Sequence, residues 1–262
     1  NCSFCIEGNK YSSQDEETIY EKIKHIITLK QRYKTRYFFF CDCAINNYPS
    51  LFREIIWNLR TAKIRWGAFA VPSMLNKKDV LIMKKAGCEY LLLGIESGSP
   101  RILKLMRKAH TINSAIKVLK LTKQVGIYNY CFFVTNFPGE TELDHKLTKE
   151  FIIKHKRLMD DAFVEIFSLN IGSHISLAPE EYGIKNIVPL DYFNMRYETN
   201  GLSWTQIKRI GRKKKRDLDT LIFRNIKLRR YFNSPVSALQ KFLYSRLVLK
   251  AYPLDRLFDY VV

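Results

Sequence analysis

The feature that most constrains the fold of this chain is a repeated alternation of short apolar runs with longer stretches of helical periodicity. Five runs are apolar along most of their length: residues 37–41, 66–71, 90–93, 128–134 and 161–169. Such runs are typical of strands buried on both faces of a parallel sheet. Each run and the stretch after it occupy roughly 30 residues, which suits a strand and a covering helix. The pattern predicts an α/β fold in which right-handed crossovers build a barrel or an open, doubly wound sheet.

The stretches between the runs show the apolar periodicity of helices. Helices are expected over residues 15–33, 51–59, 76–85, 102–106, 112–125 and 140–157. Gly87 follows one of them directly and is expected to be its left-handed cap. After residue 179 the alternation stops, and from about residue 192 the chain is expected to be mainly helical. We therefore predict a core over residues 1–185 and a basic helical C-terminal region over residues 186–262.

Composition and charge narrow the class of protein. A hydrophobic content of 47% with 13% aromatic residues favours a folded globular protein. No apolar run approaches the ~18 residues of a membrane span. Nothing in the sequence is expected to mark the chain for export. The six cysteines do not show the regular spacing of a disulfide framework, which suits a reducing compartment. We expect a cytoplasmic protein.

The net charge of +19 is concentrated toward the C-terminus. From Gly201 onward, 15 Lys and Arg residues stand against 4 Asp and Glu residues. A basic region of this kind can contact nucleic acid or an anionic membrane surface. A solvated helical face is the simpler explanation, so charge alone names no partner.

The chain opens with Cys2-Ser3-Phe4-Cys5. Two thiolates at this spacing can hold one metal site, because a short loop turns both sulfurs to the same side. Zinc, a redox dithiol and an iron–sulfur site all remain open on this motif alone. No second Cys-x-x-Cys or His-x-x-x-His follows to complete a zinc site, and the fold after the pair is not that expected of thioredoxin.

Polar residues follow the predicted strands where a parallel barrel would place its functional groups. They are Asp42, Cys43, Glu96, Ser97, Asn136, the turn at residues 138–141, and Asn170. Helix capping and loop fixation are structural alternatives for Glu96, Asp42 and Asn136.

The remaining cysteines and histidines give weaker signals. Cys41, Cys88 and Cys131 are expected to be small buried hydrophobic residues, while Cys43 is a weak candidate for the site. His25, His145 and His155 are expected to face solvent, and His174 is a weak candidate for substrate contact. The many Tyr and Phe side chains are expected in the core.

Several segments together resemble radical S-adenosylmethionine (SAM) enzymes. Residues 2–5 resemble the last two cysteines of that family's Cys-x-x-x-Cys-x-aromatic-Cys loop. Residues 86–88, 93–99 and 106–108 are similar to its fourth-strand region, and residues 133–141 to its next strand and Pro-Gly-Glu-Thr turn. Residues 179–184 are similar to members that carry an N-terminal cobalamin-binding domain. The likeness covers residues 1 to about 185.

The resemblance implies a partial (β/α)6 TIM-like barrel whose first strand, and a third cluster cysteine four residues before Cys2, lie upstream of this chain. It implies a [4Fe–4S] cluster held by Cys2 and Cys5 with that third cysteine, SAM on the open iron, and a reductant such as ferredoxin or flavodoxin. In the cobalamin-binding type, cobalamin would be held by a domain outside this chain.

The resemblance also implies roles for individual residues. Phe4 would lie along the adenine through its backbone, and Glu96 and Ser97 would face the ribose or methionine part of SAM. Asp42 would face the amino end of SAM, and Asn136 and Asn170 its adenosine.

These implications predict a fragment of an enzyme that cleaves SAM reductively to a 5′-deoxyadenosyl radical. A cobalamin-dependent radical methylation or a related C–H functionalisation is the expected reaction, and the fragment alone is expected to be inactive. One alternative is a tRNA methylthiotransferase-like enzyme whose basic tail binds RNA. Another is a non-catalytic module that binds nucleic acid or a membrane surface. The substrate is not indicated.

Overall fold

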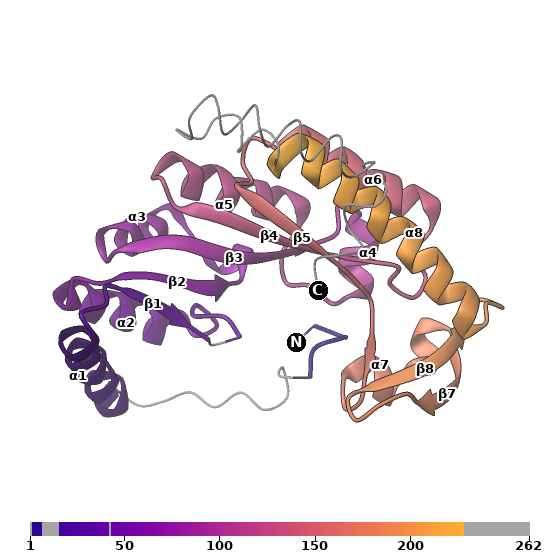
Figure 1. Cartoon of the computed structure of the whole chain (residues 1–262), viewed down its shortest axis with the longest axis horizontal. Coiled ribbons are helices and arrows are strands. Elements are labelled where there is room, and N and C mark those ends of the chain that lie inside the picture. The colour runs from indigo at the N-terminus through magenta and orange to yellow at the C-terminus, as the bar shows by residue number, and fades with distance from the viewer. Residues whose placement is uncertain (1, 7–15, 42, 228–262) are drawn as a thin grey trace.

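The computed structural model describes residues 2–6, 16–41 and 43–227. Its main element is a five-stranded parallel sheet in the order β1-β2-β3-β4-β5 (Figure 1). The strands are Tyr37–Phe40, Arg65–Ala70, Cys88–Glu96, Tyr128–Thr135 and Asp161–Ile166. Because spatial order follows chain order, the sheet is singly wound, as in a barrel, and not doubly wound. The predicted partial TIM-like barrel is confirmed.

Helices connect the strands and cover the outer face of the sheet (Figure 1). They are α1 Glu16–Tyr33, α2 Pro49–Ala62, α3 Lys77–Lys85, α4 Pro100–Leu105, α5 Ile112–Gln124 and α6 Glu142–His155, with a short 3₁₀ turn, η2, at Pro72–Met74. Capping boxes at Asn76, Thr111 and Thr141 fix three of the starts. Gly87 has a φ of +89°, which confirms its predicted left-handed conformation.

The two faces of the sheet differ in burial. On the outer face, Leu91, Leu93 and Phe133 are completely or almost completely buried under the helices. On the inner face, Tyr90 and Tyr130 are only half-buried. The prediction of strands buried on both faces is therefore wrong for the inner face, and several predicted core aromatics line it.

A second, antiparallel sheet follows the barrel strands. It has the order β6-β8-β7, with β6 Leu169–Asn170, β7 Ile184–Pro189 and β8 Asn194–Thr199, and a helix α7 His174–Leu177 and a 3₁₀ turn η3 Pro179–Tyr182 lie between β6 and β7. The prediction of helix from about residue 192 is wrong here. Tyr197 and Thr199 are buried while Glu198 between them is half-exposed, which is the alternation of a strand. The predicted boundary at residue 185 falls inside β7.

The chain then forms α8, Trp204–Ile222, which ends in a π-helical segment, η4, at Phe223–Lys227. α8 packs on β5 and α6 at the edge of the parallel sheet (Figure 1). The predicted helix is confirmed over this stretch, and residues 228–262, which share the prediction, lie outside the described residues. Among the described residues, no helix has the length and apolar character needed to cross a membrane.

Candidate functional site

The cysteine loop is fixed to the protein through Ser3, which is fully buried. The backbone N–H of Ser3 donates to the Met106 carbonyl at 2.9 Å, and the Ser3 carbonyl accepts from the Ile175 N–H at 2.8 Å. The Cys5 N–H donates to the Cys2 carbonyl at 3.3 Å, which closes a turn. Both thiols are therefore carried by one turn, next to α4 at the end of β3.

The two thiols on this turn fit a soft metal centre as part of its ligand set. Cys2 and Cys5 are half-buried and form no disulfide. No group of three His, Cys, Asp or Glu side chains among the described residues could hold a metal ion. The described loop therefore offers two thiolates, and an iron–sulfur cluster needs a further ligand.

A buried ion pair links the cysteine loop to the end of β3. Lys108 Nζ donates to Glu96 Oε1 at 2.9 Å, and their side chains are only 13% and 10% exposed. Burial on its own would lower the pKa of Lys108, but the negative charges of Glu96 and the Cys2 sulfur outweigh it and hold that pKa above its ordinary value. The ammonium also lies 5.8 Å from the centre of the Phe4 ring. Lys108 was not predicted as a site residue.

Glu96 owes its position to the backbone at the strand end. Its φ is +64°, and the register of β3 against β4 shifts between Gly94 and Glu96. A Cβ at Gly94 would lie 2.3 Å from Glu96 Oε1, so a side chain here would shift the carboxylate from its present position. The group that lies closest to this glycine is the chain's own Glu96.

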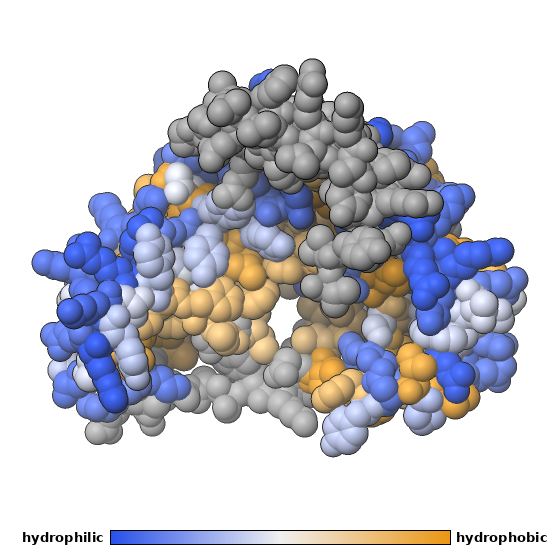
Figure 2. Space-filling view, viewed as in Figure 1, coloured by the Kyte–Doolittle hydropathy of each residue, from blue (hydrophilic) through white to orange (hydrophobic). Residues whose placement is uncertain are grey.

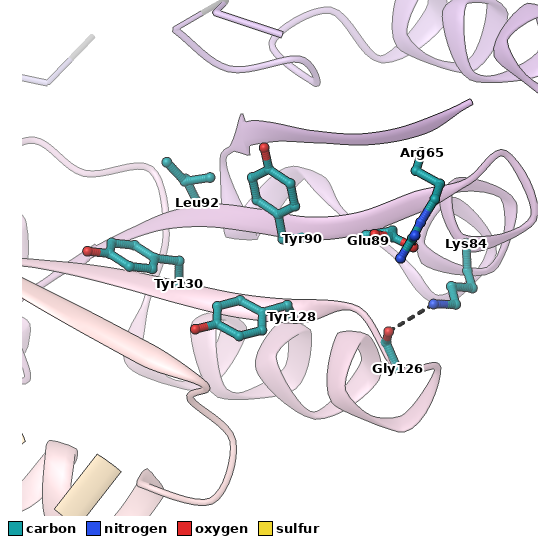
Figure 3. Close-up of a pocket in the computed structure, with 8 residues that line it drawn as sticks. All are labelled: Arg65, Lys84, Glu89, Tyr90, Leu92, Gly126, Tyr128 and Tyr130. Carbon is teal, nitrogen blue, oxygen red and sulfur yellow. Dashed lines mark hydrogen bonds and ion pairs between the residues drawn. The ribbon is translucent and has the colours of Figure 1, made fainter. Parts of the chain in front are cut away.

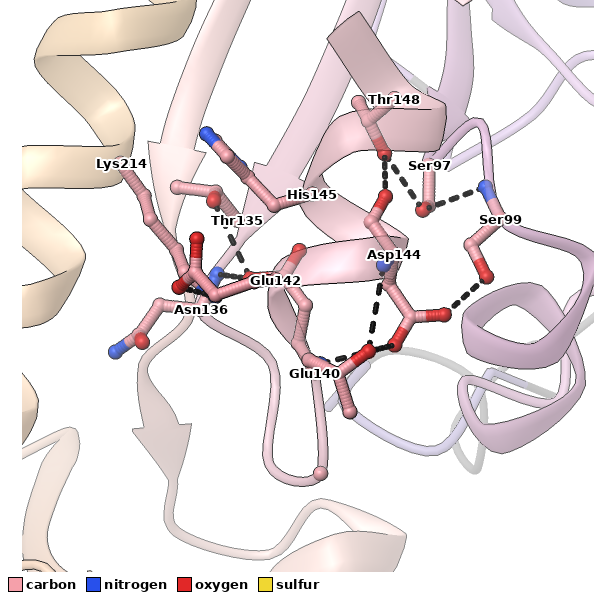
Figure 4. Close-up of polar contacts among 12 residues, drawn as sticks. Ser97, Ser99, Thr135, Asn136, Glu140, Glu142, Asp144, His145, Thr148 and Lys214 are labelled. Carbon is pink, nitrogen blue, oxygen red and sulfur yellow. Dashed lines mark hydrogen bonds and ion pairs between the residues drawn. The ribbon is translucent and has the colours of Figure 1, made fainter.

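Ser97 is turned away from the cysteine loop. Its fully buried hydroxyl lies 3.1 Å from Thr148 Oγ1 of α6 and accepts from the Ser99 N–H at 3.1 Å (Figure 4). The hydroxyl ties the strand end to α6, and the SAM contact predicted for Ser97 stays a prediction.

Asp144 of α6 connects the ends of β3 and β4 (Figure 4). It accepts hydrogen bonds from Ser99 at 2.6 Å and from the Thr141 N–H at 2.9 Å, and it pairs with Arg101. Burial would raise the pKa of Asp144, but the bonds from Arg101, Ser99 and Thr141 hold it well below its usual range.

Asn136 at the end of β4 is held by structural contacts. Its φ is +60°, a conformation that Asn tolerates better than most residues. Its N–H donates to Glu140 Oε2 at 2.7 Å, and its Nδ2 donates to the Ile207 carbonyl of α8 at 3.1 Å. Its amide nitrogen is thus bound to α8, and the adenosine contact predicted for Asn136 stays a prediction.

Glu140 forms a second buried ion pair, with Lys214 of α8. The two atoms Lys214 Nζ and Glu140 Oε2 are 3.0 Å apart, and the side chains are 6% and 2% exposed. Figure 4 shows Lys214 reaching from α8 to the turn after β4. Sequence reasoning missed this lysine. The available signal was its position on the buried stripe of α8, with Ile207, Gly211 and Leu218.

The other predicted site residues have mixed outcomes. The Phe4 ring packs edge-on against Phe137, with 6.3 Å between ring centres. Phe137 belongs to a second cluster of buried hydrophobic side chains, separate from the one under the parallel sheet. Asn170 is half-buried, and its carbonyl accepts from the Ser173 hydroxyl at 2.7 Å. Asp42 lies outside the described residues.

His174 Nε2 is 2.7 Å from Arg107 Nη1, close to the cysteine loop, which keeps it a candidate for substrate contact.

The remaining thiols divide by exposure. Burial raises the pKa of the Cys88 and Cys131 thiols, as expected for inert core residues. Cys41 and Cys43 are exposed, so the prediction that Cys41 is buried is wrong.

His145 is also buried, contrary to prediction, and its Nε2 lies 3.1 Å from Asp217 of α8. His25 is exposed as predicted, and His155 is half-buried.

The fold and the thiol turn define a parallel α/β barrel with candidate metal ligands at the carboxyl ends of its strands, which is where such barrels carry their active sites. Comparison with known proteins identifies the family. The chain belongs to the Radical SAM superfamily, whose sequence model matches residues 1–152.

Individual relatives are more distant. The chain is 28% identical over 160 residues to an uncharacterized methyltransferase of Pyrococcus horikoshii, covering 59% of this chain and 34% of that protein. It is 26% identical to a tRNA-2-methylthio-N(6)-dimethylallyladenosine synthase of Azobacteroides pseudotrichonymphae, covering 56% and 35%. It thus spans about a third of these relatives.

Among solved structures, the chain is similar to the cobalamin-dependent S-adenosylmethionine radical enzyme OxsB with aqua-cobalamin bound. The TM-score is 0.67 at 14% identity, over 95% of this chain and 44% of OxsB. This likeness shows a shared fold that extends beyond residue 152.

Proposed function

We propose that the protein containing this chain is a radical SAM enzyme whose [4Fe–4S] cluster is held by Cys2, Cys5 and a cysteine upstream of residue 1. The observation that carries the proposal is the position of the thiol turn. Ser3 fixes it between the C-terminal end of α4 and α7, and Cys2 lies beside Lys108 of the Glu96–Lys108 pair at the end of β3. A cluster at this turn would lie at the barrel mouth, next to the buried charges that can orient a polar cofactor.

When bound, the cluster and SAM supply the one-electron cleavage of a sulfonium C–S bond, which amino-acid side chains do not perform. The chain's own residues hold and shield the reacting groups. Lys108 neutralises one oxygen of Glu96 and leaves Oε2 of Glu96 to bind a hydroxyl or ammonium group. Phe4 and Phe137 cover one side of the turn and exclude water from it.

The class of reaction that we propose is a cobalamin-dependent methyl transfer or a related C–H functionalisation. The name of the Pyrococcus relative and the description of OxsB support it. Cobalamin would be held by another part of the full-length protein, and a ferredoxin or flavodoxin would supply the electron.

The test is anaerobic iron and sulfide reconstitution of the full-length protein, followed by dithionite and SAM. We expect a broad absorbance near about 400 nm and release of 5′-deoxyadenosine or a methylated product. Cys5→Ser should abolish both signals, while Cys41→Ser, which changes an exposed thiol outside the turn, should keep both. Equal signals in Cys5→Ser and the unchanged protein would rule the proposal out.

A second candidate function is tRNA modification of the methylthiotransferase type. It is favoured by the name of the Azobacteroides relative and by five exposed cations on one side of α8, namely Lys208, Arg209, Arg212, Lys213 and Arg216. Cations in such a stripe can follow a phosphate backbone and make binding strongly salt-dependent.

This candidate is tested by tRNA binding across a salt series. Arg209→Glu/Arg212→Glu/Lys213→Glu should flatten the salt dependence. Lys78→Glu/Lys117→Glu/Lys120→Glu, an equal charge change at exposed lysines of α3 and α5, should not. If the α8 triple change leaves tRNA binding unaffected, the tRNA assignment is excluded. It is also excluded if the protein binds anionic lipid vesicles but not tRNA.

A further inference from the structure

The inner face of the parallel sheet carries a cavity of about 560 Å³ that none of the assigned roles uses. Its lining residues come from β2, α3, β3, the α5–β4 connection and β4: Arg65, Lys84, Glu89, Tyr90, Leu92, Gly126, Tyr128 and Tyr130 (Figure 3). Hydrophobic surface borders the hollow in the middle of Figure 2. A volume of this size with a mostly apolar lining and a few polar groups is typical of small-molecule sites.

One glycine leaves the space that the Tyr90 ring occupies in the wall of this cavity. A Cβ at Gly67 of β2 would lie 2.3 Å from the ring atoms of Tyr90, so any other residue would displace that ring. The Phe39 ring is parallel to the Tyr90 ring within 2°, with 6.0 Å between the ring centres. The stacked Phe39 ring fixes the orientation of the Tyr90 ring, which contributes an aromatic surface to the cavity. Such a surface suits the face of a planar ring better than a puckered or branched ligand.

The tyrosine hydroxyls add neutral hydrogen-bond donors. Burial raises the pKa of Tyr90 and of Tyr130, so both phenols stay protonated at neutral pH. Figure 3 shows Leu92 between these two rings on the same side of the sheet. The middle of the cavity is thus uncharged, with an apolar floor and phenolic O–H groups at its edge.

The charged side chains of the cavity lie at the amino ends of the strands. Lys84 Nζ donates to the Gly126 carbonyl at 2.9 Å, and Arg65 pairs with Glu89. Arg65, Lys84 and Glu89 together carry one net positive charge. This end of the cavity therefore favours a ligand with one anionic group.

We propose that the inner-face cavity binds a planar, unsaturated ring system that carries a carboxylate, with the carboxylate at the Lys84 end. If the proposed function holds, this ligand is the substrate class, and its far edge points along β3 toward Glu96. Glu96 lies six positions after Tyr90, which is roughly 20 Å of strand. The reacting atom would therefore lie at the end of the ligand opposite the carboxylate.

The test is isothermal titration calorimetry of the full-length protein with 2-naphthoate, in the absence of cluster, SAM and reductant. Decahydro-2-naphthoate has the same charge without the flat ring, and methyl 2-naphthoate has the ring without the charge. We expect 2-naphthoate to bind at least about fivefold more tightly than either, the size of one ring-stacking or exposed charge contact. Equal affinity for the flat and saturated acids would overturn the proposal.

Variants assign the binding to this cavity. Tyr90→Leu should weaken 2-naphthoate about fivefold and leave the saturated acid unchanged. The control Tyr192→Leu, at an 86% exposed tyrosine between β7 and β8, should change neither. Lys84→Gln should weaken 2-naphthoate but not its methyl ester, while Lys85→Gln, at the exposed neighbour, should have no effect. An unchanged affinity in both Tyr90→Leu and Lys84→Gln would place any binding elsewhere.

The outcome is separable from that of the proposed function. If the full-length protein cleaves SAM but does not bind 2-naphthoate, only the cavity assignment is rejected. Intact ring-selective binding in a protein that forms no cluster would reject the radical SAM proposal alone.

Discussion

The ends of β3 and β4 contain the same kinds of residues in two different surroundings. Each has a left-handed polar residue, Glu96 with φ +64° or Asn136 with φ +60°, and each has a buried lysine–glutamate pair. At β3 the pair lies against the thiol turn, whereas at β4 it is enclosed by α8. A buried ion pair at a strand end is therefore not by itself a sign of chemistry, and its neighbours decide its role.

The difference is visible in how each pair is shielded. Glu140 and Lys214 are 2% and 6% exposed, and Glu140 also accepts from the Asn136 N–H. Glu96 and Lys108 are 10% and 13% exposed, and Lys108 also interacts with Cys2 of the cysteine loop. We conclude that the β4 pair stabilises the contact between barrel and α8, whereas the β3 pair lies beside the thiol turn.

The largest expected effect is on the stability of the β4 end. Lys214→Met should lower the free energy of unfolding by about 3–5 kcal/mol, because Glu140 would be left buried without a cation. Urea denaturation measures it, and Lys213→Met at the exposed neighbour should stay within about 0.5 kcal/mol of the unchanged protein. A change below 1 kcal/mol (roughly the value of an exposed pair) in Lys214→Met would show that this pair is not structural.

The β3 end should respond in activity more than in stability. Glu96→Gln keeps the shape of the side chain and removes its charge, so SAM cleavage should slow by about 10- to 100-fold. The matched change Glu140→Gln should slow cleavage much less and lower the midpoint of urea unfolding instead. If the two variants lose activity equally, the comparison between the strand ends is wrong.

Acid should weaken the connection between the two strand ends. The pKa of Asp144 is held below its ordinary value, so this carboxylate contributes stability above its unfolded pKa of about 3.9, and that contribution is lost as the pH falls through the folded value. Asp144→Asn should therefore lower stability at pH 7 and flatten the loss of stability between about pH 5 and pH 2. Urea midpoints across this range measure both, and an unchanged pH dependence would refute the assignment.

The smallest expected effect is at Ser97. Because its hydroxyl bonds only within the connection to α6, Ser97→Ala should cost about 1 kcal/mol of stability and leave SAM cleavage unchanged. Kinetics and denaturation of the same preparation separate the two readouts. A tenfold rise in KM for SAM without loss of stability would instead support the cofactor role predicted from the sequence.

The local features of this fold could be predicted from sequence because their causes are local. The strand–helix alternation, the left-handed Gly87 and the position of Glu96 at a strand end all follow from residues close together in the chain. β8 was missed because Met195 to Thr199 alternate over only a few residues within a basic, helix-like region.

The partners of the site residues could not be predicted in this way. Lys108 is 12 residues from Glu96 and Lys214 is 74 residues from Glu140, so the pairs exist only once the barrel and α8 have packed. The same holds for Ser97 and Asn136, whose side chains are bound by Thr148 and Ile207. Sequence position located the strand ends, and tertiary packing decided which way each side chain turns.

The central claim is that the thiol turn fixed by Ser3 holds an iron–sulfur cluster beside Glu96. The most direct measurement is the iron content and low-temperature EPR spectrum of the reduced, reconstituted full-length protein. We predict about four irons per chain, a signal that changes when SAM is added, and loss of both in Cys2→Ala but not in Cys41→Ala. Full iron content with an unchanged, SAM-responsive signal in Cys2→Ala would contradict the claim.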